Sequence, residues 1–219
     1  MNPRTPAQAW QEMVRGNDRF VAGEPEHPRQ NVERRAEVAS GQEPIAALFG
    51  CSDSRLSAEI IFDKGIGDLF VIRNAGQVIS ESVVGSLEYA VAVLHVPLIV
   101  VLGHDSCGAV RAAIDSQTKD APVLPAHIEN LISRIVPAVR RVAGADGAFN
   151  AQGEIDPALV DSKDVGREHL RDTITELLEE SELISDAVAA GTLAIVGANY
   201  SLLVGKAEPD TVIGSLATA

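Results

Sequence analysis

Two short apolar runs constrain the fold of this chain more than any other feature of its sequence. One run covers residues 45–50 and the other covers residues 97–103, and each gives way to a stretch with helical periodicity. Continuous apolar runs of this length, followed by helices, are typical of strands that are buried on both faces of a parallel sheet. In such sheets, ligands bind beyond the carboxyl ends of the strands, where the strand order reverses. The sequence therefore predicts an α/β fold whose functional residues directly follow these runs.

The residues that follow the two runs have the side chains of a metal site. Cys51 and Asp53 come after the first run, and His104 and Cys107 come after the second. Thiolate, imidazole and carboxylate are the ligands that zinc uses in proteins. An isolated cysteine is usually a core residue, but the chain has only two cysteines and both lie in this pattern. We therefore predict a zinc site, with one Zn²⁺ per chain.

The remaining patterns predict a central, mostly parallel sheet of four to five strands flanked by helices, in a single domain over residues 1–219. We expect residues 144–157 to be an internal loop, and Pro137 to kink a helix. The expected strands are 45–49, 69–73, 98–102 and 193–198, with an edge strand at 211–216. The expected helices are 5–22, 31–40, 57–62, 79–95, 108–115, 126–142, 158–180 and 181–190.

Charge and hydropathy exclude several kinds of partner. The net charge is −13, which argues against nucleic acid or an anionic membrane as the main partner. The sequence contains no apolar stretch of 18 residues, so we expect no membrane span. The N-terminal residues lack the apolar segment of a signal peptide. We therefore expect a cytoplasmic protein, where thiols stay reduced and cysteines more often bind metals or catalyse reactions than form disulfides.

Three motifs together resemble those of bacterial β-class carbonic anhydrases, and the similarity extends from the first helix to the fourth strand. The motifs are Cys51-Ser52-Asp53-Ser54-Arg55, Arg73-Asn74-Ala75-Gly76 and Gly103-His104-Asp105-Ser106-Cys107-Gly108. The resemblance implies that Cys51, His104 and Cys107 hold the zinc, and that Asp53 either fills the fourth position or pairs with Arg55. It also implies a homodimer, which in many members of the family assembles further into a homotetramer. We expect active sites at the subunit boundary, with residues 1–44 as a helical arm packing on the partner subunit and residues 45–219 as the α/β zinc core.

The function that this resemblance implies is the zinc-dependent, reversible hydration of CO2 to bicarbonate and a proton, by attack of zinc-bound hydroxide on CO2. Such an enzyme is a carbonate dehydratase, a zinc lyase. A catalytic zinc needs a position for water, whereas four protein ligands close the site. Arg55 favours the arrangement that leaves a position for water, because its planar guanidinium group can bind a carboxylate bidentately. Two thiolates already neutralise Zn²⁺, so we expect it to acidify water less than zinc on three imidazoles does, and activity to rise toward alkaline pH.

Five further positions correspond to the substrate pocket of the family. Gln42 lies nine residues before the first cysteine, where the family has a hydrogen-bond donor to substrate. Phe70, Ala75 and Tyr89 match its apolar and aromatic residues, and the backbone N–H of Gly108 suits a bicarbonate oxygen. Without the resemblance, Phe70 and Tyr89 would be interpreted as core residues and Gln42 as a polar loop residue.

Two alternatives keep the zinc site but change the function. The same centre can hydrolyse carbonyl sulfide or carbon disulfide, or it can be a closed structural or sensor site in which Asp53 binds the metal. A regulatory bicarbonate pocket known in some members is doubtful here, because Leu48 replaces its tryptophan although Arg73 and Tyr200 match its other residues. The remaining histidines are predicted to be surface or structural residues: His27, His95, His127 and His169.

Overall fold

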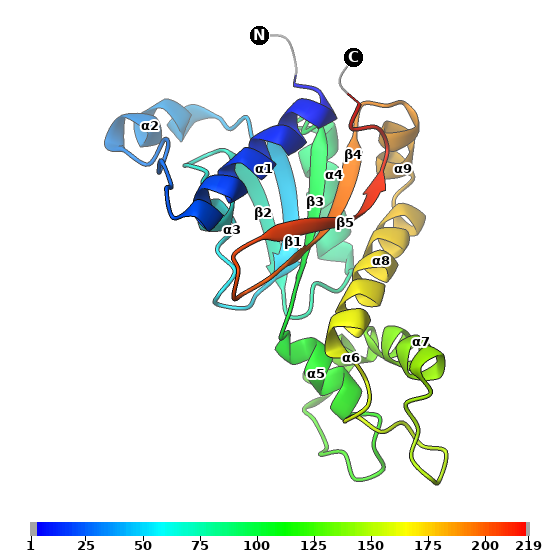
Figure 1. Cartoon of the computed structure of the whole chain (residues 1–219). Helices are drawn as coiled ribbons and strands as arrows, with labels where there is room; N and C mark the ends of the chain where they lie inside the picture. The colour runs from blue at the N-terminus through cyan, green and yellow to red at the C-terminus, as the bar shows by residue number, and fades with distance from the viewer. Residues whose placement is uncertain (1–3, 218–219) are drawn as a thin grey trace.

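The structure is a computed structural model that describes residues 4–217. In this part of the chain a five-stranded sheet has the order β2-β1-β3-β4-β5. Its strands are β1 (Ala46–Cys51), β2 (Leu69–Asn74), β3 (Leu98–His104), β4 (Ala194–Tyr200) and β5 (Ala207–Ile213). The first four are parallel, and β5 pairs antiparallel with β4 at one edge. The predicted mostly parallel sheet flanked by helices is confirmed (Figure 1).

Helices cover both faces of the sheet and the carboxyl ends of its strands. They are α1 (Pro6–Ala22), α2 (Val32–Glu37), the 3-10 helix η1 (Val38–Ser40), α3 (Ala58–Ile61), α4 (Glu81–Ala92), α5 (Gly108–Asp115), α6 (Ala126–Ser133), α7 (Val136–Asp146), α8 (Ser162–Glu180) and α9 (Glu182–Ala189). Helices α5, α6 and α7 lie beyond the carboxyl ends of the parallel strands (Figure 1). None of the helices within residues 4–217 has both the length and the apolar character needed to cross a bilayer.

The two apolar runs of the sequence form the central strands. All residues of β1 and β3 are buried. Successive side chains of a strand point to opposite faces, so Leu48 belongs to the core cluster that also contains residues of α1, whereas Phe49 belongs to the cluster with residues of α4, α8 and α9. Burial on both faces explains why these strands have continuous apolar sequences rather than alternating ones. Because the two clusters lie on opposite faces of the same sheet, they support the prediction of a single domain, which remains a proposal.

The prediction of one kinked helix over residues 126–142 was wrong. The structure has two helices, α6 and α7, and Pro137 lies in the first turn of α7. Proline lacks an N–H and clashes with the preceding turn, so it is tolerated at the start of a helix but not inside one. Helix α7 then continues to Asp146, into the predicted loop, and Gly147 follows it with a φ of 65°.

The predicted N-terminal arm is divided between two environments. Helix α1 packs on its own chain: the buried amide of Asn17 donates to Ile61 O (3.1 Å) and Gly205 O (2.8 Å). The approach is so close that a Cβ on Gly16 would lie 1.8 Å from Phe62 O. Helix α2, in contrast, has no buried residue and projects away from the sheet (Figure 1). Packing on a partner therefore stays a prediction for α2 and η1, and residues 1–3 lie outside the described part.

Candidate metal centre

The two predicted metal-binding segments meet where the strand order reverses. Strand β1 pairs with β2 on one side and with β3 on the other, and the chain passes from β2 across β1 to reach β3. Cys51 is the last residue of β1 and His104 is the last residue of β3. Cys107 is the N-cap of α5. This is the edge at which open α/β sheets bind ligands.

The side chains of Cys51, His104 and Cys107 converge at this edge. Their ligand atoms all lie within 4.8 Å of one another, and all three residues are buried. Both cysteines are free thiols. One imidazole and two thiolates at such a spacing match the protein ligands of a catalytic zinc, which leaves its fourth position to water or substrate.

The ring of His104 is oriented for a metal. Its Nδ1 lies 2.8 Å from Asp105 O, and because a carbonyl oxygen only accepts, Nδ1 carries the proton. The other nitrogen, Nε2, therefore has a lone pair, and it is buried with no hydrogen-bond partner among the described residues. A buried polar atom without a partner costs about 1–3 kcal/mol. A metal ion bound at Nε2 removes this cost, so the residues fit a zinc ion.

Backbone amides stabilise negative charge on the two sulfur atoms. Cys51 Sγ accepts a hydrogen bond from the N–H of Gly76 at 3.4 Å. The amides of Ala109 and Val110, in the first turn of α5, hydrogen-bond Cys107. The pKa of Cys51 is lowered, first by a hydrogen bond from the Cys107 thiol, and the pKa of Cys107 is raised because Cys51 accepts its proton. Ionisation of one thiol therefore opposes ionisation of the other, and a divalent cation would favour ionisation of both.

Asp53 is held by Arg55. The guanidinium donates from Nε to Oδ1 (2.9 Å) and from Nη2 to Oδ2 (2.6 Å). This side-chain hydrogen bond is the main reason that the pKa of Asp53 is well below its usual range. Arg55 also donates to Ser106 O at 3.2 Å, which links the two loops of the site. Of the two arrangements that the sequence left open, the structure has the Asp53–Arg55 pair, and metal ligation by Asp53 would require these bonds to break.

Arg73 and Asn74 support the centre in ways that the sequence did not reveal. Arg73 donates from Nε to Cys51 O (2.9 Å) and from Nη2 to Asp53 O (2.6 Å), so it fixes the backbone of the first ligand segment. The amide of Asn74 donates to Val78 O (2.7 Å) and accepts from Val78 N (2.9 Å), which closes the turn after β2. Their motif was recognised in the sequence, but only these contacts show what the side chains do.

Two of the five predicted pocket residues lie at the centre. Ala75 is exposed and follows Asn74, the β2 residue that pairs with Cys51. Gly108 is exposed at the start of α5, beside Cys107, and a Cβ there would meet no atom within 4 Å. The backbone at this position is therefore open to a small ligand.

The other three pocket residues are not brought to the centre by this chain. Phe70 pairs with Ala47, four positions before Cys51 on β1, which corresponds to about 13 Å along a strand. Tyr89 lies beside Phe70, with ring centroids 6.1 Å apart, and is 46% exposed. Gln42 is exposed and precedes β1, at the opposite end of the sheet.

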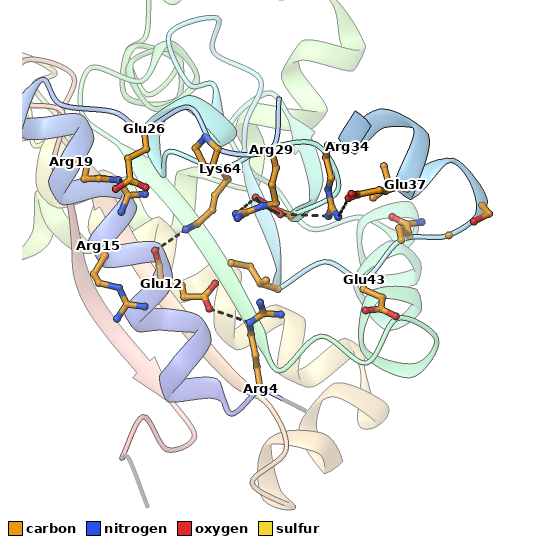
Figure 2. A pocket seen from close by; sticks show the side chains of 17 residues that line it. Arg4, Glu12, Arg15, Arg19, Glu26, Arg29, Arg34, Glu37, Glu43 and Lys64 are labelled. Carbon is orange, nitrogen blue, oxygen red and sulfur yellow. Dashed lines mark hydrogen bonds and ion pairs between the residues drawn. The ribbon is translucent and has the colours of Figure 1, made fainter. Parts of the chain in front are cut away.

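Gln42 instead lines a charged hollow of about 700 Å³ between α1, the segment after it and the start of β1. Figure 2 shows its charged side chains, several of which are paired. Arg4 donates to Glu12 at 3.2 Å, and Arg29 contacts Asp68 at 2.6 Å. This hollow contains none of the clustered metal ligands.

Known proteins with a similar sequence or structure are carbonic anhydrases. The carbonic anhydrase family profile matches residues 46–207. Carbonic anhydrase 2 of Mycobacterium tuberculosis is 45% identical over 96% of both chains, and a carbonic anhydrase of Mycolicibacterium smegmatis is 43% identical over the same shares. Among solved structures, a tetrameric β-carbonic anhydrase from Sordaria macrospora has the same fold, with a TM-score of 0.71, 22% identity, and coverage of 94% of this chain and 98% of that one.

Proposed function

This chain belongs to the β-class carbonic anhydrases, which are carbonate dehydratases, and we propose that it hydrates CO2 reversibly with one zinc ion held by Cys51, His104 and Cys107. The observation that carries this proposal is His104 Nε2, a buried nitrogen that has no hydrogen-bond partner among the described residues and belongs to a ring clustered with two thiols. A structural role for the histidine alone would leave that nitrogen unsatisfied. The relatives at 43–45% identity support the reaction.

A zinc ion held by Cys51, His104 and Cys107 would act as a Lewis acid that lowers the pKa of a water molecule, and so would provide a nucleophile for CO2 at moderately alkaline pH. The role of Arg55 is to keep the carboxylate of Asp53 paired and away from the metal, so that the fourth coordination position of the zinc remains free. Because the pKa of Asp53 is lowered, its carboxylate stays ionised and can accept a hydrogen bond that orients a water. The N–H of Gly108, at the start of a helix, suits an oxygen of bicarbonate.

The three distant pocket residues support a second part of the proposal, namely that a partner subunit completes the site. Gln42, Phe70 and Tyr89 lie too far from Cys51 to serve the centre of their own chain. In a homodimer, these residues can face the centre of the other subunit, with α2 and η1 packing across the boundary. We propose a homodimer that can assemble into a homotetramer, the state named for the Sordaria structure, and a cytoplasmic location, where the thiolate ligands stay reduced.

Metal analysis and size measurement together test the site and the assembly. Purified protein is expected to hold one zinc per chain and to elute in light-scattering chromatography as a dimer or a tetramer. Cys107→Ser is expected to lose most of the zinc while remaining folded by circular dichroism. Full zinc content in Cys107→Ser would contradict the ligand set, and a stable monomer that hydrates CO2 would contradict the shared site.

A further inference from the structure

A buried histidine outside the metal cluster contacts the turn that hydrogen-bonds one of the thiolates. His169, on α8, is 4% exposed, and its Nε2 lies 2.7 Å from Gly76 O. Because a carbonyl oxygen only accepts, Nε2 carries the proton and donates it. The N–H of the same Gly76 donates to Cys51 Sγ at 3.4 Å. Hydrogen bonds to the two backbone groups of a single residue, Gly76, thus connect α8 with the sulfur.

The turn that contains Gly76 has an unfavourable backbone and is held on several sides. Gly76 and Gln77 have φ angles of 78° and 47°, and the left-handed region costs a residue with a side chain roughly 1–2 kcal/mol. The side chain of Asn74 closes the turn through two bonds to Val78. The hydroxyl of Thr173, one turn after His169 on α8, lies 2.8 Å from His169 O and 3.3 Å from Gln77 O, so its single proton is shared between the two carbonyl oxygens. Such a conformation persists only where its surroundings over-determine it.

The direction of the Gly76 N–H matters because hydrogen bonds to a ligating sulfur change how it binds a metal. An amide that donates to a thiolate withdraws electron density from it, and outer contacts of this kind tune both affinity and electronic structure. The carbonyl and the amide of Gly76 flank one Cα, so a donor fixed on the carbonyl also limits rotation of the amide. A Cβ on Gly76 would lie 2.9 Å from Ala109 Cβ, so the turn also packs against the helix that follows Cys107.

We propose that His169 is a positioning residue of the metal centre: through Gly76 it fixes the amide that hydrogen-bonds Cys51, and it thereby sets how strongly this thiolate binds the metal. This inference rests on the proposed zinc function. Burial lowers the pKa of His169, so the ring is neutral and serves as a donor through Nε2 alone. A purely structural role would predict lower stability and an unchanged metal centre.

Cobalt substitution separates the two roles, because Co²⁺ bound by thiolates has sulfur-to-metal charge-transfer bands that report on each sulfur. His169→Leu removes the donor at similar volume, and His169→Gln places an amide N–H near the position of Nε2. We expect His169→Leu to shift the charge-transfer band to longer wavelength and to weaken zinc affinity by about 10–100-fold. His169→Gln is expected to restore the wild-type band and most of the affinity.

Leu170→Ala is the matched control, because Leu170 is fully buried on the same helix and packs against Gly197 of β4. It is expected to lower the thermal midpoint without moving the band. A His169→Leu protein with the wild-type band and affinity would overturn the proposal. If His169→Leu does not fold, His169→Asn takes its place, since its shorter amide falls short of Gly76 O. Identical bands in the Asn and Gln variants would then overturn it.

The same measurements distinguish this proposal from the function on which it rests. Wild-type protein that takes up neither zinc nor cobalt would overturn the metal centre, and the role of His169 with it. Wild-type protein that binds one metal ion per chain, with His169 variants that match it in spectrum and affinity, would overturn only the positioning role.

Discussion

Arg55 binds both oxygens of Asp53 beside the metal cluster. Nε donates to Oδ1 at 2.9 Å and Nη2 donates to Oδ2 at 2.6 Å, and the backbone N–H of Arg55 adds a bond to Oδ1 at 2.9 Å. A carboxylate with three such donors is poorly available to a metal ion. We infer that the pair keeps the fourth position of the centre free.

Replacing Arg55 by alanine is expected to release Asp53 toward the metal. Turnover of CO2 should fall by about 100-fold or more, the effect typical of losing a positioned catalytic group, while zinc content stays at one per chain. Stopped-flow hydration and metal analysis on the same sample check both parts. Arg111→Ala is the control, because Arg111 pairs with Asp115 on the exposed side of α5 and its loss should leave turnover unchanged. Wild-type turnover in Arg55→Ala would contradict the role of the pair.

The rate of hydration is expected to rise toward alkaline pH. Two thiolates neutralise the charge of Zn²⁺, so it acidifies water less than zinc on three neutral imidazoles does. Asp53 does not contribute to this rise, because Arg55 lowers its pKa and the carboxylate is already ionised in mildly acid solution. The dependence of kcat on pH measures the effect. A profile that is flat from mildly acid to alkaline conditions would be the contrary result.

Asp63 is expected to stabilise the packing of α1 on the core in a pH-dependent way. Its side chain is 1% exposed and lies 2.6 Å from Arg19. Burial opposes its ionisation, but the amides of Glu26 and His27 and the Arg19 guanidinium outweigh burial and lower its pKa. A carboxyl with a lowered folded-state pKa contributes stability above its unfolded value, near 4, and this contribution is lost as pH falls through the folded value.

Asp63→Asn should therefore lower the free energy of unfolding by about 3 kcal/mol at pH 7, and the difference from wild type should shrink below pH 4. Urea unfolding at several pH values measures it. Asp115→Asn, which breaks an exposed pair with Arg111, should cost less than about 1 kcal/mol at any pH. An equal effect of the two substitutions at pH 7 would show that Asp63 is not a buried anchor of α1.

Gly76→Ala is expected to damage both stability and metal binding. The residue has a φ of 78°, and its added Cβ would lie 2.9 Å from Ala109 Cβ and 3.1 Å from Ile135 Cδ1. Strain and overpacking together should cost about 3 kcal/mol, and displacement of the amide should weaken zinc binding. Gly144→Ala is the control: Gly144 lies in α7 with open space around it, so alanine should stabilise the protein by about 0.5–1 kcal/mol. Thermal unfolding and zinc titration measure the two effects. Wild-type stability and wild-type zinc affinity in Gly76→Ala would contradict the prediction.

The sequence was sufficient to predict that Cys51, His104 and Cys107 lie together, because their placement depends on local patterns. Continuous apolar runs identified β1 and β3, and the carboxyl ends of adjacent parallel strands meet at one edge. The edge strand was less predictable: β5 begins at Ala207, four residues before the expected start, and contains Pro209 at an irregular point of its pairing with β4. Proline is a poor strand signal that is tolerated at edges and bulges.

Contacts between distant segments were not accessible from the sequence. His169 has no local signal, because its role depends on Gly76, 93 residues earlier in the chain. The same is true of Arg73, whose side chain reaches back to the carbonyls of Cys51 and Asp53 on the neighbouring segment. Such roles follow from tertiary packing rather than from periodicity or composition.

The most direct test of the zinc-dependent hydration of CO2 is a stopped-flow measurement on the zinc-loaded protein at mildly alkaline pH. We expect rapid turnover that a chelator abolishes and that one equivalent of zinc per chain restores. The Cys107→Ser protein, which lacks one ligand, should show neither turnover nor restoration. Absence of CO2 hydration by protein that holds one zinc per chain would contradict the proposed function, and turnover that survives complete removal of zinc would contradict the proposed centre.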